Sequence, residues 1–329
     1  MRVIIAGGSG MIGRALVDEL AGGENEIIVL SRSPEKVTGL PEGARAEKWD
    51  GKSVDGWGHL VDGAEAVINM AGANIGESRW TSERKRLIMT SRIESTQAVV
   101  EAISQANTKP EVLLQGSAVG YYGGNRGDEI MTETSEPGVD FIADVVKKWE
   151  SAVAPAAEMT RLVIARTANV LTTKDGALNR LISPVNFIAE LTVGDGIESA
   201  IDPALKPLNF LSGGGPLGSG KQWMHWIHIE DEINALLFLL KNKAISGIYN
   251  LAAPEALRNR EFTQVLSKVL QRPSFIPVPG FVIKMLVGEM ASLVLEGQRV
   301  SGDKIIEAGY DFEYPKAMRA LKDIIYSEK

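Results

Sequence analysis

The chain has 329 residues, 44% of them hydrophobic and 23% charged, close to the values of ordinary globular domains, which excludes collagen, coiled coil and general disorder as the main architecture. It carries 35 Lys and Arg against 42 Asp and Glu, a net charge of -7, whereas general nucleic-acid binders show a basic excess. The absence of cysteine excludes disulfides, zinc–thiolate sites and thiol nucleophiles and fits a cytoplasmic protein.

No segment is predicted to enter a membrane. The apolar run at the N-terminus is too short for the core of a secretory signal. The nearest candidate for a membrane span, residues 280–297, is interrupted by Lys284, Glu289 and Glu296. We interpret it as an amphipathic core helix.

Short apolar runs alternate with helical patterns in the first half of the chain. Strands are predicted at residues 3–6, 26–30, 64–69, 111–115 and 161–166. Helices are predicted at residues 11–20, 82–105 and 141–157. Because parallel strands need crossover helices, this series predicts an α/β fold, a Rossmann-type doubly wound parallel sheet.

The pattern loosens after residue 166. Pro and Gly are frequent in residues 183–222, which predicts a long loop or lid. The segments that follow are predicted to be a strand at 223–229, a helix at 231–241 with Asp231 as its N-cap, a strand at 248–251 that joins the main sheet, and a helix at 261–270.

The strongest local signal is the spacing G-x-x-G-x-x-G at Gly7, Gly10 and Gly13, between the first strand and the first helix. The first glycine permits a tight turn, the second lets backbone approach a pyrophosphate, and the third lets the helix pack close to the strand. The helix start at Met11 and Ile12 would direct its N–H groups toward the phosphates. This context predicts a dinucleotide site; the alternative is a glycine-rich turn that only packs.

The end of the second strand indicates which dinucleotide is bound. An Asp or Glu there would bind the 2′-hydroxyl of NAD, but this chain has Ser31 and Arg32. Arginine matches a 2′-phosphate in charge and geometry, so NADP(H) is the predicted cofactor. The alternative is a solvated arginine.

Small residues follow the strand at 64–69. Ala71 and Gly72 leave room for a cofactor to lie across the carboxyl edge of the sheet. Arg92, in the next helix, is predicted to reach a phosphate, with an ordinary surface arginine as the alternative. We therefore expect residues 1–170, completed by about 223–252, to form an NADP-binding Rossmann domain. Residues 171–222 and 253–329 would form a smaller, mostly helical substrate-side domain.

Together, several motifs resemble an atypical extended short-chain dehydrogenase/reductase, of the branch called "epimerase family protein". They are residues 7–13, 31–32, 69–72 (Asn-Met-Ala-Gly), 117–123 (Ser-Ala-Val-Gly-Tyr-Tyr-Gly), 140–150, 215–223 (Gly-Pro-Leu-Gly-Ser-Gly-Lys-Gln-Trp) and 226–231 (Trp-Ile-His-Ile-Glu-Asp). Residues 277–325 resemble the family's C-terminal domain of unknown function, and residues 185–212 are longer than the family pattern. The resemblance implies an NADP(H)-dependent oxidoreductase or nucleotide-sugar-type epimerase of unknown substrate. The alternative is a catalytically weak NADP(H) sensor or scaffold, linked to division.

The Tyr-x-x-x-Lys pair of ordinary members is absent from the sequence. Phe141 and Val145 stand near the places of that tyrosine and lysine. Ser117 matches the family's serine, and Tyr121 or Tyr122 is predicted to substitute as the acid. The alternative is that these three residues only line the nicotinamide pocket.

Four residues are candidates for contact with a small-molecule substrate. Arg166 and Asn169, at a strand end, would bind polar substrate groups, and Trp223 would cap the pocket. His228 would orient a loop at the carboxyl edge of the sheet. A homo-oligomer is possible, and neither nucleic acid nor membrane is expected as a partner.

Two further patterns are interpreted as coincidental. Residues 215–221 approach a phosphate-binding loop, but Gln222 follows where Ser or Thr is needed, and then a strand-like run. A metal cluster is suggested by His225, His228, Glu230 and Asp231. Positions 225 and 228 of a strand point to opposite faces, so no metal is predicted.

Overall fold

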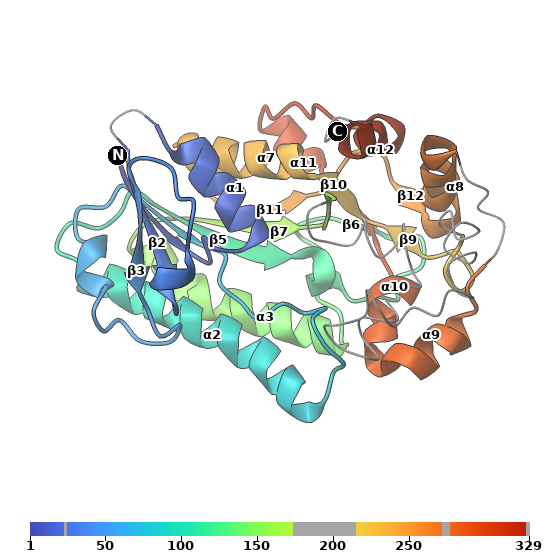
Figure 1. Ribbon diagram of the computed structural model, residues 1–329, viewed down its shortest axis with the longest axis horizontal. Helices are drawn as coiled ribbons and strands as arrows, with labels where there is room; N and C mark the ends of the chain where they lie inside the picture. Colours follow the sequence, from blue (N-terminus) through green and yellow to red (C-terminus); the bar gives the residue numbers. More distant parts are fainter. Residues whose placement is uncertain (23–24, 174–214, 272–276, 327–329) are drawn as a thin grey trace.

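A computed structural model describes residues 1–22, 25–173, 215–271 and 277–326. Its centre is a parallel seven-stranded sheet in the order β11-β7-β5-β4-β1-β2-β3 (Figure 1). The strands are β1 (Arg2–Ala6), β2 (Glu26–Ser31), β3 (Ala44–Lys48), β4 (Ala66–Asn69), β5 (Val112–Ala118), β7 (Arg161–Thr167) and β11 (Gly247–Leu251). The order changes direction between β1 and β4, which is where such sheets bind ligands.

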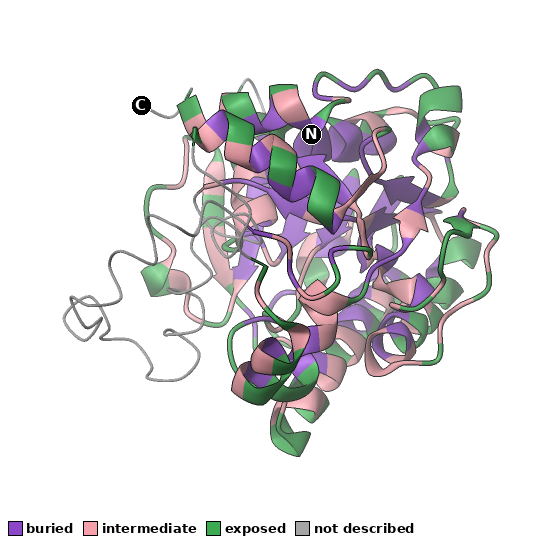
Figure 2. Cartoon of the chain, turned by 90° about the vertical axis from the view of Figure 1, so that its right-hand side faces the viewer, coloured by how far each residue is buried: buried purple, intermediate pink, exposed green. Residues whose placement is uncertain are grey.

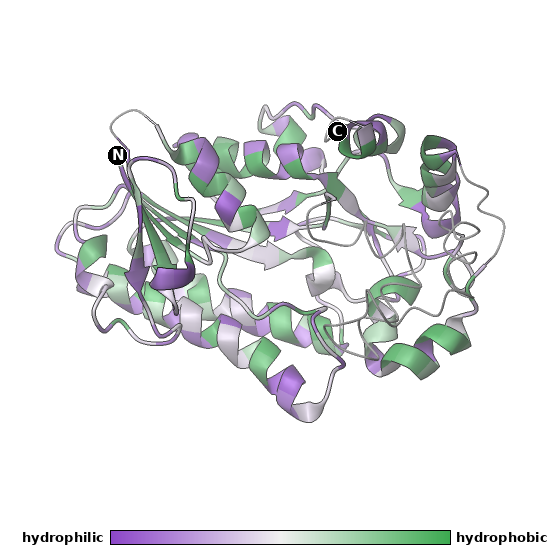
Figure 3. Ribbon diagram, viewed as in Figure 1, coloured by the Kyte–Doolittle hydropathy of each residue, from purple (hydrophilic) through white to green (hydrophobic). Residues whose placement is uncertain are grey.

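Helices cover both faces of this sheet. Helices α1 (Met11–Leu20) and α7 (Ile229–Lys241) lie on one face, and α2 (Ser82–Gln105) and α3 (Phe141–Val153) on the other (Figure 1). Side chains of β1 alternate between the two cores, since Val3 and Ile5 pack in one and Ile4 in the other. The sheet is buried at the centre of the molecule (Figure 2), and β1 and β2 are strongly hydrophobic (Figure 3). The predicted Rossmann-type fold is confirmed.

A smaller, mostly helical part follows along the chain and packs around a third apolar cluster. Its helices are α8 (Asn259–Leu270), α9 (Gly280–Val287), α10 (Ser292–Leu295) and α12 (Ala317–Tyr326), while α11 (Asp303–Glu307) contributes Ile305 to a core of the main sheet. Short two-stranded pairings join it to the first part, through β6 (Ile130–Met131) with β13 (Arg299–Val300), β8 (Asn169–Leu171) with β10 (Trp226–His228), and β9 (Trp223–Met224) with β12 (Leu257–Arg258). The 3₁₀ turns are η1 (Pro34–Lys36), η2 (Gly58–Val61), η3 (Val119–Tyr122), η4 (Ala154–Glu158) and η7 (Gly288–Ala291).

The strand predicted at 223–229 is wrong as one element. The structure has two short strands there, β9 and β10, which separate at His225 and pair with different partners. The prediction of Asp231 as a helix N-cap is also wrong. His228 is the N-cap of α7, and its Nδ1 accepts a hydrogen bond from the Glu230 amide at 3.1 Å.

Other predicted elements differ from the structure in their boundaries or in their number. Strand β3 has no counterpart in the prediction, because its sequence Ala-Arg-Ala-Glu-Lys lacks an apolar run. The single helix expected at 280–297 is replaced by α9, η7 and α10, since Gly288 ends α9 with a φ of 61°. The predicted strand at 248–251 does join the main sheet, as β11. Of the predicted loop at 183–222, residues 183–214 lie outside the described residues, as does the whole 185–212 segment.

None of the helices described is long and apolar enough to cross a membrane.

Candidate functional site

The glycine turn between β1 and α1 is closely packed. Gly7 has a φ of 80°, and a Cβ atom built on it would lie 2.7 Å from the carbonyl carbon of Met70. The Gly10 amide donates to the Gly7 carbonyl oxygen at 3.1 Å. A Cβ on Gly13 would lie 2.2 Å from that same oxygen. Only glycine therefore allows α1 to start this close to the strand.

The first turn of α1 is open to an anion. Its N-cap, Gly10, supplies no capping side chain, and the turn that begins with Met11 and Ile12 holds no acidic residue. The first backbone N–H groups of a helix have no partner within the helix and carry partial positive charge. The turn lies at the carboxyl end of β1, beside the point where the sheet changes direction. These are the features that a pyrophosphate-binding turn requires.

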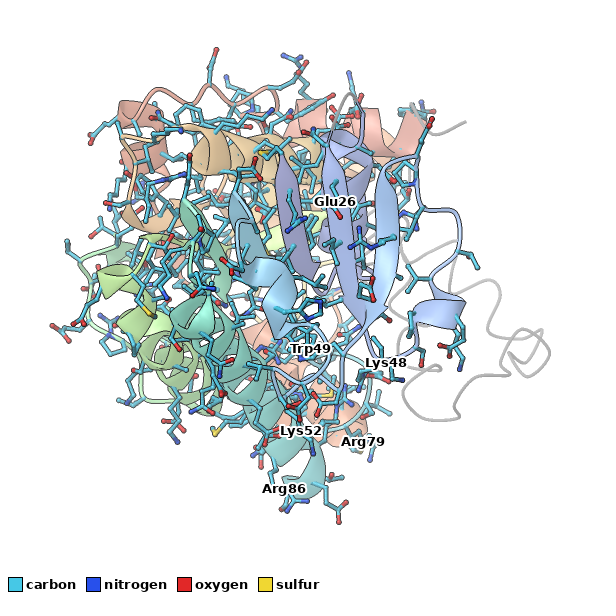
Figure 4. The ribbon with its side chains drawn as sticks, turned by 90° about the vertical axis from the view of Figure 1, so that its left-hand side faces the viewer. Glu26, Lys48, Trp49, Lys52, Arg79 and Arg86 are labelled. Atoms are coloured by element: carbon cyan, nitrogen blue, oxygen red, sulfur yellow. The ribbon has the colours of Figure 1, made fainter. Side chains whose placement is uncertain are left out.

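The predicted 2′-phosphate site lies at the ends of β2 and β3. Ser31 ends β2, and the side chain of Arg32 is exposed beyond it. Lys48 lies opposite Ser31 in the sheet, and its ammonium group donates to the Arg32 carbonyl oxygen. Figure 4 shows Lys48 and Lys52 at the end of the sheet opposite Glu26. Lys48 is not among the predicted site residues, because strand β3 has no apolar run and shows only small and charged residues in the sequence.

The loop after β4 is held by Arg92. Its Nη1 donates to the carbonyl oxygens of Ala73 at 3.1 Å and of Ile88 at 2.9 Å. A Cβ on Gly72 would lie 3.1 Å from the Arg92 side chain, so the small residue lets the guanidinium lie against the loop. Burial lowers the pKa of Arg92 to about 10. Arg92 and Ala71 thus lie at the loop after β4, beside the predicted cofactor site.

The candidate catalytic residues lie in a buried hydrogen-bond network. The Ser117 hydroxyl donates to Glu150 Oε1 at 2.6 Å. Arg166 donates to both carboxylate oxygens of Glu150 at 2.8 Å and to the Tyr122 hydroxyl at 3.0 Å. The Tyr122 hydroxyl in turn donates to Asn250 Oδ1 at 2.6 Å. The network joins β5, η3, α3, β7 and β11. Glu150, which ends the motif at residues 140–150, and Asn250 belong to it, although neither is among the predicted site residues.

Burial limits what this network can do directly. The side chain of Arg166 is 1% exposed, and Tyr122 is fully buried. Burial raises the pKa of Tyr122 to about 12. The ring of Tyr121 stacks on the guanidinium of Arg166, with 3.5 Å between Cζ and the ring centre. This geometry favours a positioning role for Arg166 and Tyr122 over contact with a substrate.

A cavity of about 720 Å³ lies between the carboxyl edge of the sheet and the C-terminal helices. One wall comes from the ends of β5 and β7 and the start of α3, and the other from α9, η7 and α10. Its lining is mainly apolar and includes Trp80, Ala118, Phe141, Ile142, Thr167, Asn169, Leu217, His225, Val278, Ile283, Val287, Leu293, Val294 and Gln298. Phe141 and Trp80 contact each other edge to face, with 5.1 Å between ring centres. This cavity is the candidate substrate pocket.

Of the four predicted substrate residues, the cavity lining includes Asn169. Trp223 lies outside that lining; its indole N–H donates to the Asp128 carboxylate at 3.0 Å. His228 is 1% exposed, and its ring stacks on Tyr314 with 3.8 Å between centres. Burial lowers the pKa of His228 to about 4. His228 therefore sits at the junction of α7 with the C-terminal segment rather than at the cavity.

The structure also places the two patterns interpreted as coincidental. Residues 215–221 lead into strand β9 and not into a helix, and Leu217 bridges to Val278. Within the described ranges, no group of three or more His, Asp or Glu side chains could hold a metal ion.

Comparisons with known proteins agree with this geometry. Residues 3–252 match the model of the NAD dependent epimerase/dehydratase family, and residues 278–324 match a domain of unknown function (DUF1731). The "Epimerase family protein SH2119" of Staphylococcus haemolyticus is 36% identical over 98% of this chain and 98% of its own. The crystal structure of the human epimerase family protein SDR39U1 with NADPH has 30% identity and a TM-score of 0.80, and the match covers 98% of this chain and 99% of that chain.

A further similar structure is the nucleoside-diphosphate sugar epimerase of Corynebacterium glutamicum, with 27% identity and a TM-score of 0.70. That match covers 99% of this chain and 58% of the other. The tight glycine turn at the first crossover and the family match over residues 3–252 lead to one conclusion: the chain belongs to the NAD dependent epimerase/dehydratase family, in its epimerase family protein branch.

Proposed function

We propose that this protein is an NADP(H)-dependent oxidoreductase that acts on a mainly apolar carbonyl compound. The observation that carries the cofactor assignment is the glycine cradle, which a Cβ atom at Gly7 or Gly13 would fill. The backbone around Gly10 and the start of α1 would hold the pyrophosphate. When bound, the cofactor supplies hydride transfer at its nicotinamide. The NADPH in the structure of the human relative supports this choice.

The preference for NADP(H) over NAD(H) is assigned to the ends of β2 and β3. Arg32, Lys48 and the Ser31 hydroxyl offer two positive charges and a hydrogen bond to a 2′-phosphate. An acidic residue that would bind the 2′-hydroxyl of NAD is missing from the end of β2.

The composition of the cavity favours a carbonyl compound over a nucleotide sugar. Among the lining residues that the structure describes, the only Lys or Arg is Lys284, which lies on the exposed surface of α9. A diphosphate needs arginine or lysine partners and helix N–H groups, while an apolar ligand needs the aromatic and aliphatic wall that is present. We therefore rank the reduction of an apolar aldehyde or ketone above the epimerisation of a sugar nucleotide.

Replacement of Arg32 by alanine should weaken NADPH binding by about 1.5–3 kcal/mol, because a charged hydrogen bond to the 2′-phosphate is lost. NADH binding should barely change. Titration calorimetry with both cofactors measures the difference. Arg86→Ala, which removes an exposed arginine of α2, is the control and should leave both affinities unchanged. An equal loss for NADPH and NADH would make Arg32 a structural residue.

The proposed activity is tested by NADPH oxidation in the presence of apolar aldehydes and ketones, with UDP-sugars as the competing class. Turnover with the carbonyl probes supports the oxidoreductase. Tight NADPH binding without turnover of either class would favour the sensor or scaffold that the missing tyrosine–lysine pair also allows.

A further inference from the structure

The wall of the cavity carries a hydroxyl that is linked to a buried carboxyl group. Thr167, at the end of β7, lines the cavity and is partly exposed. Its hydroxyl donates a hydrogen bond to Oε1 of Glu232, on α7, at 2.7 Å. Glu232 is fully buried, and its second oxygen, Oε2, has no hydrogen-bond partner in the part of the chain that is described. Thr167 therefore links Glu232 to the cavity.

The surroundings of Glu232 favour its neutral form. Burial raises the pKa of Glu232 to about 8. Of the acids on its own helix, Asp231 is already engaged by the hydroxyl of Tyr310. Burial lowers the pKa values of His225 and His228, just before α7, to about 4, so neither imidazole is charged at neutral pH.

Among the elements packed against α7, strand β7 brings Arg161, but this guanidinium donates to the carbonyl oxygens of Leu239 and Leu240, in the last turn of the helix and not at Glu232. Helix α1 turns Leu16, Val17 and Leu20 toward the core that it shares with α7. On the side of the C-terminal segment, Glu313 and Tyr314 donate their amides to Asp231. In the described ranges, no Lys or Arg forms an ion pair with Glu232. Burial without a charged partner therefore favours the neutral form of this carboxyl group.

We propose that Glu232 and Thr167 form a proton-donating pair of the cavity, with Thr167 contacting the carbonyl oxygen of the substrate. This inference rests on the proposed reductase function. It gives the cavity the proton donor that ordinary members of the superfamily obtain from the tyrosine–lysine pair. Ser117 and Tyr122 are instead held by Glu150 and Arg166.

Reduction of the substrate carbonyl takes up one hydride and one proton. The carbonyl carbon gains a hydride from the reduced nicotinamide, and its oxygen takes the hydroxyl proton of Thr167. For this step the protonated Oε1 of Glu232 donates along the 2.7 Å contact to Thr167 Oγ1 while the Thr167 hydroxyl donates to the substrate, and the carboxyl proton then passes to Oγ1 and restores the hydroxyl group. Glu232 is left as a carboxylate and regains a proton from water through Thr167 after the alcohol leaves. The net change is carbonyl plus NADPH plus a proton to alcohol plus NADP⁺.

The protonation of Glu232 can be measured without cofactor or substrate. Infrared difference spectra of wild type minus Glu232→Gln at pH 7 should show the carbonyl stretch of a protonated carboxylic acid. This band should disappear as the pH rises through about 8. Thr167→Val, which leaves Glu232 in place, should shift the band because the hydrogen bond is lost. Absence of the band at pH 7 would overturn the proposal.

The role of the pair is measured with 4-nitrobenzaldehyde as the carbonyl probe at saturating NADPH. Wild-type kcat should fall as the pH rises above about 8, since the protonated form is the donor. Glu232→Gln should lower kcat about 100-fold and flatten this profile, with the NADPH affinity unchanged. Thr167→Val should resemble it, while Thr167→Ser, the matched control, should keep rate and profile. Wild-type rate and profile in Glu232→Gln would overturn the proposal; failure of the wild type to bind NADPH would instead overturn the proposed function and leave the infrared result standing.

Discussion

Replacement of Gly13 by alanine is expected to abolish NADPH binding and to lower the free energy of unfolding. The new Cβ atom would lie 2.2 Å from the Gly7 carbonyl oxygen and 2.7 Å from the Gly8 Cα, and both are backbone atoms that cannot turn aside. Helix α1 would have to move away from β1, and the phosphate cradle would open. Helix propensity alone predicts the opposite sign, since alanine is favoured over glycine inside a helix by about 1 kcal/mol.

Urea unfolding and titration calorimetry measure the two effects of Gly13→Ala. Gly280→Ala is a matched control, because this glycine is also helical and its Cβ would meet the nearest side chain at an ordinary 3.5 Å. That variant should be as stable as wild type or slightly more stable. A Gly13→Ala protein with wild-type stability and NADPH affinity would contradict the close contact between α1 and the turn.

Disruption of the Glu150–Arg166 pair is expected to cost about 3–5 kcal/mol of folding stability, because one buried charge loses its partner. The side chains are 10% and 1% exposed, and two hydrogen bonds of 2.8 Å join them. Arg166→Met removes both of these hydrogen bonds and leaves the Glu150 carboxylate with the one that the Ser117 hydroxyl donates. The double variant Glu150→Leu/Arg166→Met should recover much of the loss, since no unpaired charge remains.

Urea unfolding of the two single variants and the double variant gives the coupling energy of this pair. Lys243→Met is the control, because it breaks an ion pair with Glu111 in which both side chains are exposed, by 77% and 57%. That loss should be below about 1 kcal/mol. Additive effects of the Glu150 and Arg166 changes would show that the two residues do not stabilise each other.

Elements of the fold can be predicted from the sequence where burial produces a local run of apolar residues. The strands buried on both faces, such as β1 with Val-Ile-Ile-Ala, appear in the sequence as continuous apolar runs. Strand β3 lies at an edge of the sheet and is only partly buried. Charged residues interrupt its sequence, so no apolar run predicts a strand there. The division at His225 is not visible either, because β9 and β10 are set by distant partners, β12 and β8.

The same distinction applies to the candidate site, where some residues have a local sequence signal and others do not. The glycine turn has a local signal because its geometry depends on residues three apart. The contacts of Ser117 and Arg166 have no such local signal. Both side chains donate to Glu150, which lies 33 residues from Ser117 and 16 residues from Arg166 in the chain. The Thr167–Glu232 contact joins residues 65 apart. The sequence therefore supplies candidate side chains, and the packing of α3 and α7 on the sheet decides which of them face the cavity.

The charged edge of the sheet at β3 has a consequence for self-association. Arg45 forms ion pairs with Glu26 and Glu47 along this open strand. A strand of a second molecule that paired with β3 would desolvate these charged side chains without forming stronger ion pairs or hydrogen bonds with them. The charged side chains of this strand therefore disfavour the edge-to-edge addition through which exposed strands polymerise.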